Sequence, residues 1–412
     1  MKKYKLGELI EVSRGASLKG DFYAASGKYI RLTCGNFDYR NNSFKENTSK
    51  DNLFYIGEFK AEFLLEKGDL ITPLTEQAIG LLGSTAWIPE SGKYIQSQDI
   101  AKIICKEELL DKKFAYYLIS SNMVKQQLSA AAQQTKIRHT SPDKIKDCTV
   151  WLPSLEKQKQ IGQLLFDLDR KIELNHAINH NLEAMAKQLY DYWFVQFDFP
   201  DKNGKPYKSS GGKMVWNEKL KRELPRGWEV TKIGSILDKV IITPRLSTDE
   251  YLPSGTYPII DQTTDVYYAG FTERKEAVVN QYPAVIFGDH SCVVKYVNFP
   301  FVRGADGTQV ILSKDSNIPI EYLYYAIKGV KIGKGYARHF SFLKEQPVIV
   351  PSEKEVKDFE NIVQTFFEQI TRNRKETLSL TKQRDELLPL LMNGQVKVGV
   401  ERSRLNYDLS ND

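Results

Sequence analysis

The stretch that decides the fold is residues 152–193, LPSLEKQKQIGQLLFDLDRKIELNHAINHNLEAMAKQLYDYW. Pro153 stops a preceding strand and Ser154 is a good helix N-cap, so we expect a helix to begin here. Apolar residues then recur at helical spacing through the whole stretch. They are Ile161, Leu164, Leu165, Leu168, Ile172, Ile178, Leu182, Met185 and Leu189. The pattern predicts one long helix.

A second stretch has the same design, opening with Pro351-Ser352. Its apolar positions are Phe359, Ile362, Val363, Phe366, Ile370, Leu380 and Leu387. In both stretches a seven-residue grid of apolar residues is interrupted once by asparagine, and the grid positions are Ile161, Leu168, Asn175, Leu182 and Leu189, then Phe359, Phe366, Asn373, Leu380 and Leu387. Such a grid is typical of a coiled-coil seam, so we expect the two helices to pack on each other. A surface helix packed on its own domain is the alternative.

Short matches elsewhere show that the whole chain is duplicated. They occur in the same order in both halves, with an offset that falls from 227 to 198 residues, which predicts a repeated domain pair and not a solenoid. The matches are Lys5-Leu6-Gly7 with Lys232-Ile233-Gly234, Phe114–Ile119 with Tyr322–Ile327, Arg138-His139 with Arg338-His339, and Leu152-Pro153-Ser154 with Val350-Pro351-Ser352.

Each half begins with a mixed α/β part, whose short β-branched runs predict strands. The runs are 69–71 and 100–104 in the first half, and 284–287 and 309–312 in the second, with helices expected over 111–128 and 319–328. Glycine, serine and lysine between the halves suggest an exposed linker that need not pack. We therefore divide the chain into 1–151, a central helix 152–197, a linker 198–227, a second domain 228–350, a distal helix 351–398 and a tail 399–412.

Composition excludes several classes of protein. The 412 residues are 41% hydrophobic and 27% charged, as in ordinary globular proteins. No apolar run is long enough to span a membrane, and no pair of the four cysteines has the C-x-x-C spacing of a zinc site. We expect a reduced, cytoplasmic protein. Its net charge of +6 permits nucleic-acid binding without demonstrating it.

The residues argue against an active site. Gly329–Lys334 is one residue short of a phosphate-binding loop, and the Asn-Pro-Pro-aromatic or Asp-Pro-Pro-aromatic motif of DNA amino-methyltransferases is absent. His176 and His180 have the spacing of a helical metal pair but lack a third ligand nearby. Asp289-His290-Ser291 resembles a triad only in composition. We therefore expect no catalytic residue and no metal site.

Polar and basic residues that gather near strand ends are candidates for nucleic-acid contact. Lysine and arginine neutralise phosphates, whereas glutamine, asparagine and arginine can read base edges. The candidates are Arg31, Thr33, Asn36, Gln77, Gln98, Lys136, Arg138 and His139 in the first half, and Gln262, Thr263, Arg303, Lys334, Arg338 and His339 in the second. The alternative for each residue is a solvated loop.

The chain resembles the specificity subunit of type I restriction–modification systems over nearly its whole length. The resemblance rests on the duplicated layout, on Leu152–Gln158 opening the first helix and on the aromatic run Tyr190–Phe199 closing it. It also rests on Leu224-Pro225-Arg226-Gly227-Trp228-Glu229, which opens the second half. The first half lacks this Pro-x-Gly-Trp opening.

The resemblance implies two α/β (α+β) target recognition domains, each reading half of a bipartite DNA site, separated by two long antiparallel coiled-coil helices. It implies that two methyltransferase subunits and restriction subunits join the chain on double-stranded DNA. S-adenosylmethionine and ATP would then bind those partners, and this chain would hold no cofactor. An enzyme with an unrecognised methyltransferase or nuclease site, and a coiled-coil adaptor without a DNA role, remain alternatives.

Two geometric expectations follow. A helix from about residue 154 to 193 spans ~60 Å, whereas duplex DNA turns about every 34–36 Å, so the target should contain an unread gap. In an antiparallel pair, Asn175 and Asn373 should face the seam within about one helical turn of each other.

Overall fold

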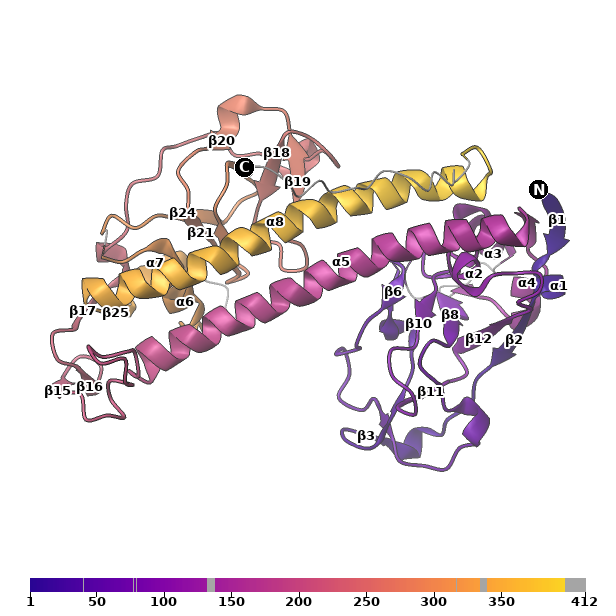
Figure 1. Ribbon diagram of the computed structural model, residues 1–412, viewed down its shortest axis with the longest axis horizontal. Coiled ribbons are helices and arrows are strands. Elements are labelled where there is room, and N and C mark those ends of the chain that lie inside the picture. Colours follow the sequence, from indigo (N-terminus) through magenta and orange to yellow (C-terminus); the bar gives the residue numbers. More distant parts are fainter. Residues whose placement is uncertain are drawn as a thin grey trace, which may run out of the picture. The chain divides into compact units, whose positions relative to one another are not determined.

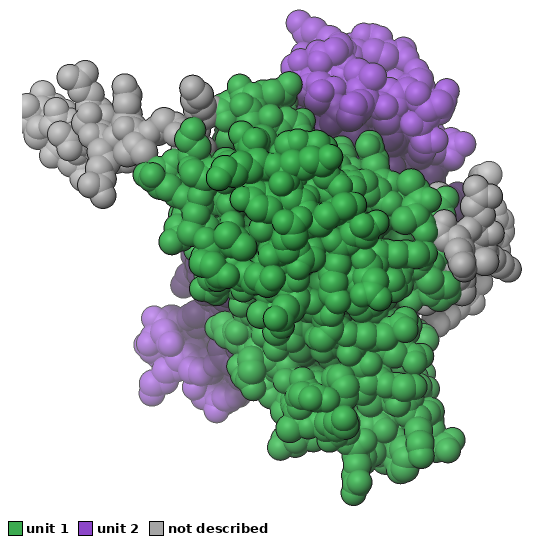
Figure 2. Space-filling model, turned by 90° about the vertical axis from the view of Figure 1, so that its right-hand side faces the viewer, with its two compact units in different colours: residues 1–173, 377–412 green, residues 174–376 purple. Residues whose placement is uncertain are grey.

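The computed structural model describes residues 1–39, 41–76, 78, 80–131, 138–315, 317–333 and 339–396. The chain forms two compact units: unit 1 comprises Met1–Glu173 and Thr377–Asp412, and unit 2 comprises Leu174–Glu376. Figure 2 colours unit 1 green and unit 2 purple. The boundaries between the two units fall inside two long helices, α5 (Leu155–Tyr190) and α8 (Glu353–Met392). Each unit therefore contains part of both helices.

Both long helices begin where the sequence predicts them (Figure 1). Ser154 and Ser352 stand immediately before α5 and α8, and in each case the serine carbonyl accepts the N–H four residues on, from Gln158 and Val356. A short π-helical turn, η4 (Asp191–Val195), follows α5. Its aromatic residues pack on helix α6 (Ile320–Lys328): Phe194 lies edge-on to Tyr322, with ring centroids 4.8 Å apart.

Unit 1 is built on a four-stranded antiparallel sheet of order β10-β8-β12-β2. A second sheet has the order β11-β4-β7-β3, and three two-stranded pairs complete the unit. The strands are β1 (Lys2–Lys5), β2 (Ile10–Arg14), β3 (Tyr23–Ala24), β4 (Tyr29–Arg31), β5 (Phe37–Asp38), β6 (Ser43–Phe44), β7 (Phe54–Tyr55), β8 (Leu70–Pro73), β9 (Thr75–Glu76), β10 (Ala86–Trp87), β11 (Tyr94–Ile95), β12 (Ile100–Cys105), β13 (Arg138–His139) and β14 (Thr149–Leu152). Its short helices are α1 (Leu6–Leu9), α2 (Lys112–Ile119), α3 (Asn122–Ala131) and α4 (Pro142–Lys146), with 3-10 turns η1 (Gly20–Phe22), η2 (Cys34–Asn36) and η3 (Ala61–Phe63).

Unit 2 repeats this plan with a three-stranded sheet of order β22-β21-β24 and a four-stranded sheet of order β19-β18-β23-β20. Its strands are β15 (Met214–Asn217), β16 (Arg222–Pro225), β17 (Glu229–Lys232), β18 (Tyr257–Ile260), β19 (Gly270–Thr272), β20 (Val278–Val279), β21 (Ala284–Gly288), β22 (Val294–Val297), β23 (Phe301–Arg303), β24 (Thr308–Ile311) and β25 (Pro347–Val350). Besides α6 it has helix α7 (His339–Glu345) and turns η5 (Ile233–Ser235), η6 (Thr248–Glu250) and η7 (Lys275–Ala277). All four strand runs expected from the sequence are strands. They are β8 and β12 of unit 1, and their counterparts β21 and β24 of unit 2.

The duplication extends to individual atoms. Strand β1 pairs antiparallel with β14 in unit 1, as β17 does with β25 in unit 2. The Lys5 amine lies 2.9 Å from the Asp147 carboxylate, and the Lys232 amine lies 2.7 Å from that of Glu345. A Cβ on Gly7 would stand 3.0 Å from Cβ of Lys146. One on Gly234 would stand 3.0 Å from Cβ of Lys344. The same close approach of a helix therefore favours glycine at both positions.

The two histidines of the repeated Arg-His dipeptide are not equivalent in the structure, contrary to the prediction. His139 is exposed in strand β13, which pairs with β9. His339 is instead a buried residue at the start of helix α7. The structural counterpart of Lys344 is Lys146, so His339 aligns with Ser141 and not with His139.

The expectation of an unpacked linker over 198–227 is also wrong, because this segment packs into the core of unit 2, to which it belongs. Strands β15 and β16 form a hairpin, and the buried Phe199 ring stacks on Tyr207 and on Trp228, with centroids 4.6 and 5.0 Å away. Gly227 has φ +91°, and Trp228 N–H donates to the Pro225 carbonyl, so this glycine permits the tight turn that delivers Trp228 to the core. The many lysines and glycines of this segment suggested an exposed linker, although its aromatic residues pack in the core.

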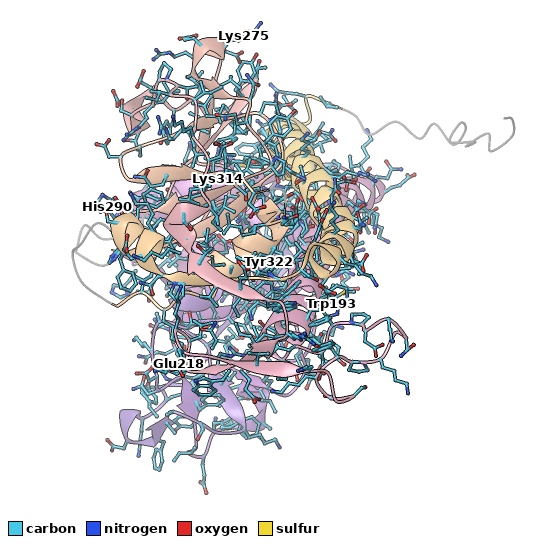
Figure 3. All side chains as sticks on the ribbon, turned by 90° about the vertical axis from the view of Figure 1, so that its left-hand side faces the viewer. Trp193, Glu218, Lys275, His290, Lys314 and Tyr322 are labelled. Atoms are coloured by element: carbon cyan, nitrogen blue, oxygen red, sulfur yellow. The ribbon has the colours of Figure 1, made fainter. Side chains whose placement is uncertain are left out.

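Apolar side chains from strands, short helices and long helices form a common core in each unit. In unit 1, Phe114 of α2 and Leu165 of α5 belong to the same cluster as Leu391 of α8. In unit 2, Trp193 and Tyr322, both labelled in Figure 3, belong to one cluster. Phe359 of α8 belongs to it as well. Among the described residues, no helix is both long and apolar enough to cross a membrane.

Candidate nucleic-acid interface

Three of the first-half candidates are structural residues, which corrects the prediction. Arg31 is buried, its guanidinium stacks over the Tyr23 ring at 3.8 Å, and it donates to the Asn52 carbonyl. Thr33 and Asn36 form a capping box around η2: Asn36 Oδ1 accepts the Thr33 N–H at 2.9 Å, and Thr33 Oγ1 accepts the Gly35 N–H at 3.2 Å. Their polar groups are satisfied within unit 1.

Other first-half candidates lie on the surface of unit 1. The side chains of Gln98 and His139 are exposed. Arg138 is half-exposed, donates to Ser129 Oγ at 2.9 Å and lies 3.5 Å from the buried Glu76 carboxylate. Arg14, which the sequence analysis missed, is exposed and donates from Nε to the Gln98 carbonyl at 2.9 Å. Gln98, Arg138 and His139 thus remain candidates, joined by Arg14.

Gln262 ties three loops of unit 2 together at the ends of their strands. Its Nε2 donates to the Asp306 carbonyl at 2.7 Å, and its Oε1 accepts the N–H of His290 at 3.1 Å. A Cβ on Gly307 would stand 2.6 Å from the His290 ring, so only glycine fits between these loops. Gln262 therefore organises this surface, on which Thr263 is exposed. His290, labelled in Figure 3, is exposed beside it.

Arg303 also has a structural task. Its Nη2 donates to the Thr243 carbonyl at 3.1 Å, and burial, with Arg245 nearby, lowers its pKa. In unit 1 the buried Gln96 makes the corresponding bond, from Nε2 to the Ser13 carbonyl at 2.9 Å. Both side chains fasten an equivalent segment to the sheet. The positive charge of Arg303 made it a candidate for DNA contact, but its position is that of a residue that holds the fold together. The exposed Arg245 beside it was missed.

Helix α7 begins against a buried carboxylate. Asp289 Oδ1 accepts the Phe340 N–H at 2.7 Å, and its backbone carbonyl accepts that of His339 at 3.3 Å. The buried His339 is thus held at the helix start, and its proposed DNA contact is not supported by its position. Gln77, Lys136, Lys334 and Arg338 lie outside the described residues.

Polar contacts cross between the long helices within each unit. In unit 2, Asn373 Nδ2 donates to Asn179 Oδ1 at 2.8 Å, and Asn175 Nδ2 donates to Glu376 Oε2 at 2.8 Å. In unit 1, Arg384 lies 2.9 Å from the Asp169 carboxylate. These pairs run in opposite chain directions on α5 and α8, so the helices pack antiparallel in unit 2. Asn175 and Asn373 are both buried between them.

The burial pattern also shows a second grid, which the sequence analysis did not use. On the first grid, Ile161, Asn175, Phe359 and Asn373 are buried, whereas Leu168, Leu182, Leu189, Phe366, Leu380 and Leu387 are half-buried. The second grid includes the buried residues Leu165, Asn179, Ala186, Trp193, Val356, Val363, Ile370, Arg384 and Leu391. Phe366, like Leu182 and Leu189, packs half-buried against the core of unit 2, and its neighbour Phe367 is fully buried there. Two alternating rows form the seam, as a coiled coil requires.

No catalytic arrangement emerges from the residues considered for one. His176 and His180 are exposed on α5. Asp289 caps α7, where its Oδ1 accepts the Phe340 N–H. Within the described ranges, no group of three histidine, cysteine, aspartate or glutamate residues could hold a metal ion.

Comparison with known families settles the class of protein. The family model described as the type I restriction modification DNA specificity domain matches residues 1–184 and again 225–380, once for each copy of the repeat. The chain belongs to the type I restriction–modification DNA specificity family. It is thus a DNA specificity subunit, with two recognition domains of mixed α/β structure and two long helices.

Individual relatives agree with this assignment. The MjaIX type I restriction enzyme specificity subunit of Methanocaldococcus jannaschii is 24% identical over 328 residues, covering 73% of each chain. The HindI specificity subunit of Haemophilus influenzae is 25% identical over 471 aligned residues, 96% of this chain and 99% of the relative. A crystal structure of the type I S subunit from M. genitalium shares the fold, with a TM-score of 0.59 at 17% identity, and covers 95% of both chains.

Proposed function

We propose that this specificity subunit reads a split double-stranded DNA target, one half with each unit, and itself catalyses no reaction. The atomic repeat of the two frameworks carries the proposal, since Gly7 and Gly234 meet equivalent lysines while the loops above them differ. Equivalent frames with different loops suit two readers of different sequences. Because α5 and α8 each contribute to both units, they would fix the separation of the half-sites.

We further propose that two methyltransferase subunits dock on duplicated apolar faces of the helices. In unit 2, a groove of about 840 Å³ is lined by Met185, Leu189, Tyr192, Ile362 and Phe366. Carrying the match of Ser154 with Ser352 along the helices aligns Leu164 with Ile362 and Leu168 with Phe366. Leu164 is 36% exposed and Ile362 is 39% exposed. Two similar exposed faces support two copies of one partner.

A larger groove, of about 980 Å³, lies within unit 1 between β10, α2 and the start of α5. Lys112 lies over the Trp87 ring, and Lys113 lies 4.4 Å from the centroid of Phe166. Aromatic faces with cations beside them suit a protein partner better than a small cofactor. S-adenosylmethionine and ATP would accordingly be bound by the methyltransferase and restriction subunits, and the complex would act in the cytoplasm.

The test is a map of modified bases in DNA treated with this chain, methyltransferase subunits and S-adenosylmethionine. We expect two short specified sequences separated by unspecified bases, and no methylation by the chain alone. An uninterrupted target would contradict the split reading. Methyl transfer by the purified chain would instead favour an enzyme with an unrecognised site, and salt-independent absence of DNA binding would favour a structural adaptor.

A further inference from the structure

A loop of unit 2, residues 239–245, presents two adjacent isoleucines to solvent. Ile242 is 92% exposed and Ile241 is 67% exposed. A single exposed apolar residue is ordinary, but two neighbours held outward form a small apolar tip that gains from contact with a partner. We call residues 239–245 the isoleucine loop.

Unit 1 has a strand where unit 2 has this loop. Strand β2 pairs with β12 from Ile10 to Arg14, and the chain then bridges from Ala16 to Ser97. Unit 2 begins in the same way, with a bridge from Leu237 to Ser313, and rejoins its sheet where Leu246 bridges to Gly304. The interval from 237 to 246 is nine residues, whereas that from 10 to 16 is six. The second unit therefore has three additional residues here, and they push the isoleucines away from the sheet.

The isoleucine loop is fastened at several points, so its exposed tip is a built feature. Gln281 holds it from one side: Oε1 accepts the Ile241 N–H at 2.6 Å and Nε2 donates to the Lys239 carbonyl at 3.2 Å. Arg303 Nη2 holds the Thr243 carbonyl from the other side. Leu246 is fully buried at the end of the loop. Four polar and apolar attachments would be unnecessary for a passive connection.

Charge selects the kind of partner. Lys239 and Arg245 are exposed on either side of the isoleucines. Arg245 is 3.5 Å from the carboxylate of Asp306, whose side chain is 98% exposed, so this contact is weak. Asp238 uses its carboxylate to accept the N–H of Lys239 at 2.7 Å. An apolar tip between two cations complements duplex DNA, in which base edges and methyl groups lie in grooves between phosphate rows.

We propose that the isoleucine loop enters a groove of the half-site read by unit 2, where Ile241 and Ile242 contact bases and Lys239 and Arg245 contact the flanking phosphates. The inference rests on the proposed function and adds its specificity-determining residues. The contact is apolar, either with a thymine methyl group or with an opened base step. Unit 1 has no such loop, so the contact belongs to one half-site only.

The test uses the full chain assembled with methyltransferase subunits and duplexes carrying the mapped target. Replacing both isoleucines, I241A with I242A, should weaken target binding about tenfold or more while leaving binding to unrelated duplex DNA unchanged. Ile56→Ala in unit 1 is the matched control, because Ile56 is 64% exposed in a loop. It should leave binding to both half-sites unchanged. Lys239→Gln and Arg245→Gln should each reduce the slope of log affinity against log salt by about 1.

Two DNA probes identify the contact. If thymine methyl groups are read, replacing one thymine by uracil in the second half-site weakens wild-type binding but not binding by the double alanine variant. If a base step is opened, 2-aminopurine at that step brightens with the wild-type complex only. Either result supports the inference.

The outcomes separate the two proposals. A wild-type complex that binds no duplex specifically would defeat the proposed function. Specific wild-type binding that the double alanine variant retains in full would overturn the inference alone. Unchanged DNA binding with fewer methyltransferase subunits per chain would assign the isoleucine loop to a protein contact and overturn it also.

Discussion

The side-chain amide of Asn373 in α8 donates a 2.8 Å hydrogen bond to Oδ1 of Asn179 in α5, and both residues are buried. One turn away, Asn175 donates to Glu376. A polar layer inside an apolar seam lowers stability relative to leucine but specifies one register, because a shifted helix leaves these groups unpaired. The asparagines therefore determine how the two helices align within unit 2.

Breaking this pair should be more harmful than removing it. Asn373→Ala leaves the Asn179 amide buried without its partner, and we expect it to cost about 1–3 kcal/mol of unfolding free energy. Changing both Asn179 and Asn373 to leucine should restore stability or exceed that of the wild type, since apolar packing replaces a buried polar pair. Urea denaturation of the full chain measures both.

Asn181→Ala is the matched control, because Asn181 is an exposed asparagine on α5, the helix that carries Asn179. It should change stability by less than about 0.5 kcal/mol. A double leucine variant less stable than Asn373→Ala would show that the layer stabilises the helix pair, contrary to this account.

The repeat was visible in the sequence because framework positions have strict physical requirements. Gly7 and Gly234 leave little room for a side chain, and the Pro-Ser pairs precede both long helices. The partner of Asn373 was not predictable, since a seven-residue grid gives one row of the seam and Asn179 lies on the other. A heptad seam needs both rows, and the buried Ala186 and Arg384 of the second row do not stand out as apolar.

The same limit explains the candidate DNA residues. Thr33 and Asn36 have the side chains of base readers, but the same side chains also cap helical turns, and here they do. Only three-dimensional burial separates the two uses. The isoleucine loop was missed for the opposite reason, because isoleucines suggest a strand. In unit 2 the stretch between Leu237 and Leu246 does not pair along its sheet as β2 does in unit 1, and its isoleucines face solvent.

Adding a methyl group at the repeated glycines should destabilise both units. In Gly7→Ala the new Cβ would lie 3.0 Å from Cβ of Lys146, and in Gly234→Ala it would lie 3.0 Å from both Cβ and the carbonyl oxygen of Lys344. We expect losses of about 1–3 kcal/mol, larger at Gly234 because a backbone carbonyl cannot swing away. Gly20→Ala and Gly333→Ala are the controls, having nothing within 4 Å, and thermal unfolding would compare the four variants.

The buried carboxyl group of Glu321 should make the stability of unit 2 fall as pH rises from acidic values. Burial raises the pKa of this α6 carboxyl, which accepts a 2.5 Å hydrogen bond from the Tyr296 hydroxyl. Below the ordinary pKa of 4.5 the folded and unfolded chains both hold the proton. Above it the unfolded chain releases the proton first, so stability falls as pH rises towards the folded pKa.

Glu321→Gln keeps an oxygen acceptor for Tyr296 and cannot ionise. Its thermal midpoint should match the wild type near pH 4 and exceed it increasingly above pH 5. Glu353→Gln provides the contrast, because Lys357 lowers the pKa of the exposed Glu353. A glutamine variant at 321 that is less stable than the wild type at pH 7 would refute the assignment of a costly buried carboxyl.

Charging one apolar helix face should remove one methyltransferase subunit and leave the other. Ile362 lines the groove of unit 2 with Phe366, and Leu164 occupies the matching position in unit 1. Ile362→Asp or Leu164→Asp buries a carboxylate in the interface on assembly, which is costly without a partner, but each site is solvent-exposed in the free chain and should tolerate the change. Light scattering should give two methyltransferase subunits per wild-type chain, one for each single variant and none for the double variant.

Leu174→Asp is the control, since Leu174 is exposed on α5 outside the unit 2 groove. If both single variants still bind two subunits, the docking faces lie elsewhere. If either single variant binds none, the sites are not independent. A stepwise loss would establish that the duplicated chain offers two equivalent docking faces, so that each half of the repeat brings its own methyltransferase to its own half-site.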